Sequence, residues 1–180
     1  EITLEICKML NCDVVNEIQV MRKTVVNGSN TSGFQRTMLV GQGGYLETSH
    51  GRVGIDSVCL EEDSARRVGK ILSTKTNKEK SIIYRLDRLG IPLVEIATCP
   101  DIKNPTQCKE TAEKLGMILR STGKVKRGIG VIRQDVNVSI KNGERVEIKG
   151  FQDLKNIPKI IDGEIKRQLK IKVKPEVRGA

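Results

Sequence analysis

The spacing of apolar residues along the chain first predicts helices. Apolar positions three or four residues apart predict a short helix ending near Asn11, a second beginning at Asn104-Pro105, and a third beginning near Asn156-Ile157-Pro158. Asn is a favoured helix cap, Pro is favoured in the first turn, and Gly123 is placed to end the second helix. In the third helix, four residues are expected to face inward: Ile157, Ile161, Ile165 and Leu169.

Alternation of apolar and polar residues predicts strands elsewhere. The expected strands cover residues 16–27, 34–40, 45–49, 52–60, 81–87 and 91–98. Gly41-Gln42-Gly43-Gly44 is expected to turn the chain, and His50-Gly51 suits a tight hairpin turn. Strands and helices do not alternate regularly, so the pattern predicts an α+β fold with a largely antiparallel sheet and helices packed on it.

One hairpin, near residues 132–149, can be predicted in register. A two-residue turn would mix polar and apolar faces, so we favour a three-residue loop, Lys141-Asn142-Gly143, with Gly143 left-handed. This register pairs Val138 with Val146, Val136 with Ile148, Asn137 with Glu147, and Asp135 with Lys149. It leaves one polar face, which carries Arg133, Asp135, Asn137, Glu147 and Lys149. Such a face is either solvated or lines an active cleft.

The charge of the chain favours a polyanionic partner. Its 180 residues include 32 basic and 22 acidic residues, a net charge of +10, which suits phosphate backbones. The alternative is a protein from a warm-living source with many surface lysines. Aromatic residues are few, so any RNA contact is expected to read backbone and shape. They are Phe34, Tyr45, Tyr84 and Phe151.

Several classes of protein are disfavoured. No apolar run approaches the ~18 residues of a membrane-spanning helix, and no secretory leader is present. The chain opens without Met, so we expect a fragment. The five cysteines include no CxxC pair, which argues against a disulfide framework or zinc ribbon and fits buried thiols in a reducing cytoplasm.

Two acidic features are candidates for chemistry. Glu61-Glu62-Asp63 places three like charges side by side, which either form a surface cluster or are compensated by a hard cation such as magnesium. Glu95 lies within the apolar run 91–97 and is expected to be at least partly buried. A buried carboxylate must be paired with a cation, bound to a metal or protonated.

Cations and a small polar loop accompany these carboxylates. The loop Gly28–Gly33 is either a plain flexible loop or a phosphate cradle, and Arg85 and Arg88 are candidate partners for Glu95 or a phosphate. Candidate ATP-binding residues are Arg22, Lys23, Ser29, Ser32 and Arg36. No P-loop is present, and His50 is the only histidine, which excludes a multi-histidine metal site and argues against a histidine-based triad. A set of carboxylates, arginines and lysines suits phosphoryl transfer on magnesium.

Five long strings resemble one family, the B and E type subunits of Glu-tRNA(Gln) amidotransferases, with the archaeal E type as the closer match. The strings are VMRKTVVNGSNTSGFQRT, ETSHGRVGIDSVCLEEDSARR, YRLDRLGIPLVEIATCPDI, STGKVKRGIGVIRQDVNVSI and VEIKGFQDLKNIPKIIDGEIKRQL. The resemblance implies a glutamine-synthetase-like α+β catalytic cradle over residues 1–169, with an N-terminal segment missing. It also implies a tail over residues 170–180, at a junction where an insertion domain is absent.

The resemblance further implies a reaction and its partners. ATP with Mg²⁺ phosphorylates the glutamate on Glu-tRNA(Gln), and ammonia from an asparaginase-like partner of the D type then gives Gln-tRNA(Gln), in a cytoplasmic heterotetramer. By the same resemblance, Glu61 (or Glu62) and Glu95 bind the metal. The cradle is lined by Arg85, Asp87, Arg133, Asp135 and Lys149, with the cations on phosphate and Asp135 beside the metal's ligands. A non-catalytic RNA-binding module or a structural ribosome-associated domain are the alternatives.

Overall fold

The computed structural model describes residues 1–72, 79–171 and 174–179. The predicted α+β class is confirmed, because three α-helices accompany sheets whose strand pairs are mostly antiparallel. The chain divides into two units that interleave in sequence. Unit 1 consists of Glu1, Thr3–Gly44 and Ile55–Thr98, and unit 2 consists of Ile2, Tyr45–Gly54 and Cys99–Ala180. None of the described helices is long and apolar enough to cross a membrane.

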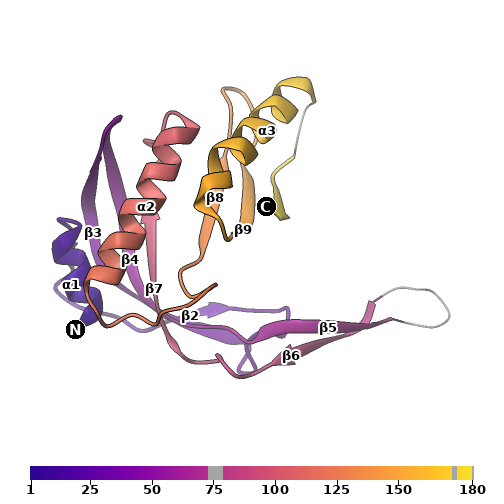
Figure 1. Cartoon of the computed structure of the whole chain (residues 1–180). Helices are drawn as coiled ribbons and strands as arrows, with labels where there is room; N and C mark the ends of the chain where they lie inside the picture. Colours follow the sequence, from indigo (N-terminus) through magenta and orange to yellow (C-terminus); the bar gives the residue numbers. More distant parts are fainter. Residues whose placement is uncertain (73–78, 172–173, 180) are drawn as a thin grey trace. The chain divides into compact units, whose positions relative to one another are not determined.

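Unit 1 is built on a five-stranded sheet in the order β1-β3-β4-β7, with β2 also paired to β3. Its strands are β1 (Asp13–Val14), β2 (Met21–Thr24), β3 (Phe34–Thr48), β4 (Gly51–Glu62) and β7 (Pro92–Thr98). Helix α1 (Ile2–Met9) buries Ile6 and Cys7. Strands β5 (Arg66–Leu72) and β6 (Glu79–Arg85) form a separate antiparallel ribbon, drawn at the lower right of Figure 1.

The expected turn at residues 41–44 is wrong, because β3 runs through it without a break. These glycines allow close packing instead. A Cβ on Gly41 would lie 2.7 Å from Cys7 Sγ, and one on Gly44 would clash with Cys12 Sγ. Glycine in a strand marks either a turn or a close approach, and here it is the second.

The remaining strand predictions are partly right. The turn at Ser49-His50 is confirmed, since β3 ends at Thr48 and β4 begins at Gly51. The expected strand over residues 16–27 is too long, because only Met21–Thr24 is paired as β2 and all four of its residues are exposed. Strand β5 was not predicted, because Arg66–Leu72 lacks a clear alternation of apolar and polar residues.

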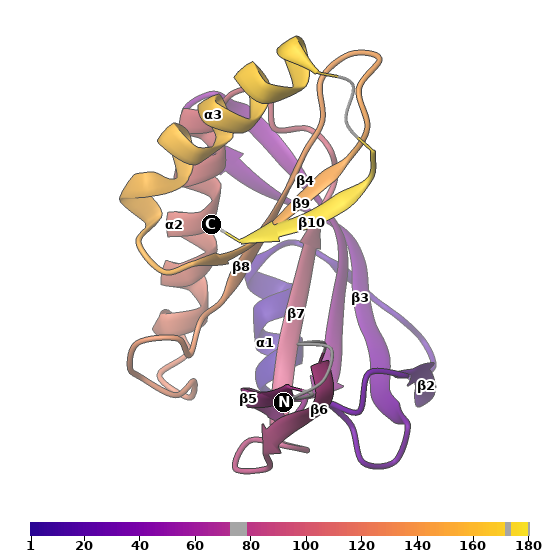
Figure 2. The same ribbon diagram turned by 90° about the vertical axis from the view of Figure 1, so that its right-hand side faces the viewer.

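Unit 2 packs two helices with a three-stranded sheet in the order β10-β9-β8 (Figure 2). Its elements are α2 (Pro105–Ser121), β8 (Gln134–Val138), β9 (Val146–Phe151), the 3-10 helix η1 (Leu154–Asn156), α3 (Ile157–Lys170) and β10 (Glu176–Gly179). Strand β10 is parallel to β9, and β8 is antiparallel to it. The core residues are Cys108, Ala112, Val138, Val146, Ile148, Phe151, Ile157 and Ile161.

Both predicted helix starts in unit 2 are confirmed. Asn104 caps α2, because its Oδ1 accepts a hydrogen bond of 2.8 Å from Gln107 N. Helix α3 buries Ile157 and Ile161 as expected, but Leu169 is 71% exposed. Each step of four residues turns an α-helix by about 40° beyond a full turn, so a series taken at every fourth position drifts off the core. The buried face continues instead through Glu164 and Gln168.

The predicted hairpin register is confirmed for three pairs, with Val138 opposite Val146, Val136 opposite Ile148, and Asn137 opposite Glu147. The left-handed residue of the loop is Asn142 (φ 63°), so the assignment to Gly143 was wrong. Asn tolerates this conformation better than most non-glycine residues. Gly143 N instead donates to Ile140 O at 2.9 Å, which closes the turn.

A bulge in β9 follows the hairpin. Between the pairs Val136–Ile148 and Gln134–Phe151, β8 has one residue, Asp135, and β9 has two. Gly150 is left-handed there, with φ 88°. The extra residue shifts the alternation by one position, so Phe151 points into the core and is only 4% exposed.

Candidate functional site

Each carboxylate of the acidic run at the end of β4 has its own cation. Glu61 Oε1 lies 3.3 Å from Lys23 Nζ, and Glu62 Oε1 lies 2.6 Å from the Arg36 guanidinium. Asp63 Oδ1 lies 3.7 Å from Arg88 Nε. The hydrogen bond from Arg36 lowers the pKa of Glu62 below its usual value. The like charges are therefore compensated within unit 1 by three different segments of the chain.

Alternation along the strands sends these pairs to opposite faces of the sheet. On one face, Lys23 is the cross-strand partner of Gln35, and Gln35 Nε2 lies 3.3 Å from Glu61 Oε2. On the other face, Arg22 is the cross-strand partner of Arg36 and lies over the Phe34 ring at 4.9 Å. The candidate phosphate-binding cations thus form two groups, one beside Glu61 and one beside Glu62.

Glu61 and Glu95 share one face of the sheet. Glu95 is the cross-strand partner of Cys59, which lies two residues before Glu61. Diagonal neighbours of this kind have Cβ atoms within about 7–8 Å. Burial raises the pKa of the Cys59 thiol, and the negative charges of Glu95 and Glu61 raise it further. The two predicted metal ligands therefore both act on the same thiol.

The environments of these two carboxylates differ. Glu61 is only 4% exposed, whereas Glu95 is exposed, so the expectation that Glu95 is partly buried was wrong. Its apolar neighbours in sequence, Val94 and Ile96, point to the opposite face of β7. The burial of a strand residue depends on what covers its own face, which the residues beside it in sequence do not report.

The donor set of this face is compatible with magnesium. No group of three His, Cys, Asp or Glu residues among the described residues is close enough to form a complete metal site. Mg²⁺, however, is usually held by one or two carboxylates together with waters and substrate phosphates. Glu61 and Glu95 supply two carboxylates on one face, which meets that requirement.

The loop before β3 is held in place by hydrogen bonds. Asn30 is 4% exposed and its Oδ1 accepts from Ser64 Oγ at 3.0 Å. Tyr84 Oη donates to Asn27 O at 2.8 Å. Of the two candidate serines, Ser29 Oγ donates to Asn30 Oδ1 and Ser32 Oγ donates to Phe34 O. The loop is thus a built feature of unit 1, with the serine hydroxyls engaged within it.

Arg85 and Asp87 lie at the end of the β5–β6 ribbon in unit 1. Arg85 is exposed and is the cross-strand partner of Arg66. Asp87 forms an ion pair with Arg66, and both side chains are nearly half exposed. Arg88 also donates from Nε to Ser64 O at 2.9 Å. Asp87 is therefore neutralised by a cation that the sequence did not single out.

In unit 2, the predicted polar face of the hairpin is present. Arg133, Asp135 and Lys149 lie on it, and Lys149 Nζ is 2.8 Å from Asp135 Oδ2 and 2.9 Å from Glu147 Oε1. Burial alone lowers the pKa of Lys149, but hydrogen bonds to Asp135 and Glu147 outweigh it, so the net shift is upward. Lys149 therefore stays charged and bridges two carboxylates.

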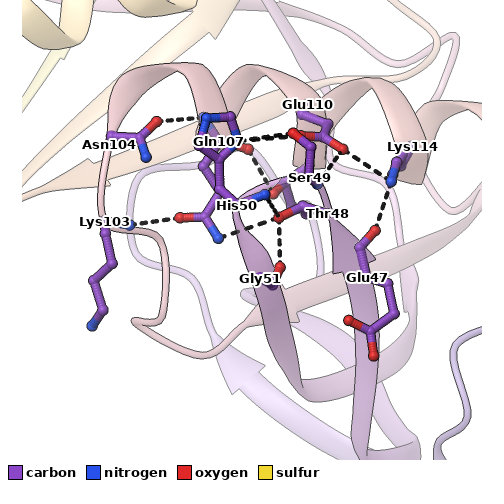
Figure 3. Close-up of polar contacts among 11 residues, drawn as sticks. Glu47, Thr48, Ser49, His50, Gly51, Lys103, Asn104, Gln107, Glu110 and Lys114 are labelled. Atoms are coloured by element: carbon purple, nitrogen blue, oxygen red, sulfur yellow. Dashed lines mark hydrogen bonds and ion pairs between the residues drawn. The ribbon is translucent and has the colours of Figure 1, made fainter.

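A polar cluster that the sequence did not reveal joins the β3–β4 turn to α2 within unit 2 (Figure 3). Glu110 accepts hydrogen bonds from Ser49 N at 2.8 Å and Ser49 Oγ at 2.5 Å, and it lies 2.9 Å from Lys114 Nζ. These bonds lower the pKa of Glu110 to about 2. The partners are 61 residues apart in sequence, so no local pattern predicts the pairing.

This cluster contains Ser, His and a carboxylate but lacks the geometry of a catalytic triad. Ser49 Oγ lies 3.0 Å and Glu110 Oε2 lies 3.4 Å from the same nitrogen, Nδ1 of His50. A triad places the serine on one ring nitrogen and the acid on the other. Ser49 also donates directly to the carboxylate, so the cluster serves to hold the turn on α2.

Comparisons with known proteins identify the family. Residues 1–178 match the model described as the GatB/GatE catalytic domain. The chain is 53% identical to the E subunit of glutamyl-tRNA(Gln) amidotransferase from Methanocaldococcus jannaschii over 178 residues, which is 98% of this chain and 27% of that protein. It is 57% identical to the protein of the same name from Methanosarcina acetivorans over 95% of this chain and 26% of that protein.

A third relative agrees with these two. The E subunit from Archaeoglobus fulgidus is 55% identical over 99% of this chain and 28% of its own length. The chain thus spans about a quarter of the length of these relatives. With the family model matched over nearly all of its residues, the chain belongs to the GatB/GatE catalytic domain family.

Proposed function

We propose that this chain carries the glutamate-activating step of a tRNA-dependent amidotransferase. The γ-carboxylate of the glutamate on Glu-tRNA(Gln) attacks the γ-phosphorus of ATP. The bond between the β- and γ-phosphates breaks, which yields an acyl phosphate and ADP. Ammonia then attacks the acyl carbon, loses a proton and displaces inorganic phosphate to give Gln-tRNA(Gln). The printed name of the relatives supports the substrate class.

The observation that carries this proposal is the common face of Glu61 and Glu95, with Lys23 beside Glu61. Phosphoryl transfer needs positioned charges more than covalent chemistry. Glu61 and Glu95 would hold Mg²⁺ with phosphate oxygens, and the ion would offset phosphate charge during transfer. A binding module for RNA backbone gains nothing from two carboxylates on one open face.

The remaining candidates divide by unit. In unit 1, Arg22, Lys23, Arg36 and Arg85 are proposed to bind phosphates, with Ser29 and Ser32 at the loop and Asp87 setting the position of Arg66. In unit 2, Arg133 and Lys149 are proposed to bind phosphate, with Asp135 fixing Lys149 through their 2.8 Å ion pair. We further propose that ammonia comes from an asparaginase-like partner of the D type in a cytoplasmic heterotetramer.

The proposal is tested by phosphate release in the full-length protein. With ATP, Mg²⁺ and Glu-tRNA(Gln), we expect wild type to release phosphate and Glu95→Gln to release it about 10²-fold more slowly or worse, as for loss of one electrostatic stabiliser. Excess Mg²⁺ should recover part of the rate if Glu95 is a ligand. Unchanged release by Glu95→Gln would remove Glu95 from the site.

A matched control separates site from charge. Glu144→Gln removes the same charge from an exposed carboxylate in the hairpin loop of unit 2, and we expect it to leave phosphate release unchanged. A wild-type protein that binds tRNA but turns over no ATP would instead support the non-catalytic RNA-binding module.

A further inference from the structure

The positive charge of the chain is concentrated in unit 2. By residue count, unit 1 has 12 basic and 11 acidic residues, a net charge of +1. Unit 2 has 20 basic and 11 acidic residues, a net charge of +9. Nearly all of the excess that favours a polyanion therefore belongs to one unit.

Within unit 2, one stretch carries cations without any acid. No Asp or Glu lies between Glu113 and Asp135. The stretch between them contains Lys114, Arg120, Lys124, Lys126, Arg127 and Arg133. A local run of one sign raises the potential along its surface and attracts opposite charge.

The members of this stretch are not equally available. Lys114 is bound to Glu110 and Glu47 O, and the Arg120 guanidinium lies back along α2, 3.5 Å from the Cβ position of Gly116. Lys126 and Arg127 are exposed, in the loop that follows α2. These two have no acidic partner among the residues that the structure describes.

The loop itself stands away from the core of unit 2. Ile129, two residues after Arg127, is 94% exposed. Only Val125 and Thr122 nearby are even partly buried. An exposed loop with two adjacent cations reaches phosphates without first breaking ion pairs, so binding there costs little desolvation of existing partners.

We propose that Lys126 and Arg127 contact backbone phosphates of the tRNA, so that this loop is an RNA-docking surface of unit 2. The inference rests on the proposed function, because that function supplies an RNA as the substrate. The contact is electrostatic and independent of sequence, since phosphate contacts position an RNA without reading its bases.

The test is the salt dependence of tRNA binding by the full-length protein, with uncharged tRNA(Gln) transcript as the probe. Each lost phosphate contact lowers the slope of log K against log[salt] by about 0.7–0.9. The double variant Lys126→Ala/Arg127→Ala is expected to lower it by about 1.4–1.8 and to weaken binding roughly 10- to 100-fold at ~100 mM KCl.

Two control variants make the result specific. Lys155→Ala/Lys159→Ala removes the same charge from two exposed lysines of unit 2 and should keep the wild-type slope. Lys126→Arg/Arg127→Lys keeps the charge and should also keep the slope. An unchanged slope in the double alanine variant, or an equal loss in the Lys155/Lys159 control, would overturn the proposal.

Phosphate release from ATP separates this proposal from the proposed function. If wild type shows tRNA-stimulated phosphate release and the double alanine variant keeps its binding slope, the docking surface is wrong and the function stands. If the slope falls as expected but wild type releases no phosphate, the surface stands and the function is wrong.

Discussion

Glu110 shows how one side chain fixes a turn that is distant in sequence. Its carboxylate accepts from the backbone and hydroxyl of Ser49 and pairs with Lys114, while Gln107, one turn earlier on α2, donates to Thr48 Oγ1 at 3.3 Å (Figure 3). The first turns of α2 therefore hold the end of the β3–β4 hairpin by side chains alone. All of these bonds to Glu110 favour its ionised form.

The ionisation of Glu110 makes part of the stability depend on pH. Its folded pKa of about 2 is below the ordinary value of 4.5, so its contribution is complete above pH 4.5 and is lost as pH falls towards 2. We expect the melting temperature of wild type to fall more steeply between pH 5 and 3 than that of Glu110→Gln. Parallel melting curves for the two proteins across this range would contradict the assignment.

At the scale of elements, glycine positions distinguish tight packing from open space. A Cβ on Gly44 in β3 would clash with both Cys12 Sγ and Leu10 O, whereas a Cβ on Gly163 in α3 would meet nothing within 4 Å. The same substitution should therefore have opposite effects at the two positions.

We expect Gly44→Ala to destabilise the protein by about 1–3 kcal/mol, as overpacking does. Gly163→Ala should stabilise it by up to ~1 kcal/mol, because alanine is the better helix former. Urea unfolding of the two variants beside wild type measures both free energies. A neutral Gly44→Ala would mean that α1 and β3 are less closely packed than described.

The sequence predicted elements better than it predicted their neighbours. The starts of α2 and α3 and the hairpin register follow from local signals, namely Asn-Pro steps and alternation. The path of β3 through Gly41 and Gly44 depends on Cys7 and Cys12 from another segment, so a local reading took it for a turn. The bulge at Gly150 had a signal, an isolated glycine within a strand, but its effect on Phe151 depends on register.

At the scale of the whole molecule, the two units divide the chemistry suggested by the chain. The predicted metal carboxylates belong to unit 1, which is nearly neutral, and most of the net positive charge belongs to unit 2. The sequence supplied the acidic run and Glu95 as candidates, but not that Lys23 and Gln35 flank Glu61. Those neighbours arrive by strand pairing from segments more than 25 residues away.

The charge division predicts where RNA touches the protein. In UV cross-linking of the full-length protein to tRNA, peptides of unit 2, and those covering residues 120–130 above all, should carry more cross-linked nucleotide than peptides of unit 1. Salt near 1 M should remove these cross-links, because the attraction is screened. Cross-links within this chain confined to unit 1 peptides would contradict the division.

The acidic run at the end of β4 also makes the arrangement tolerant of error. Three consecutive carboxylates occupy both parities of the strand, so a one-residue shift in pairing would exchange Glu61 for Glu62 without depriving either face of an acid. Lone Glu95 has no such substitute on β7, where both adjacent residues are aliphatic. Insertions and deletions should thus be better tolerated before the acidic run than before Glu95.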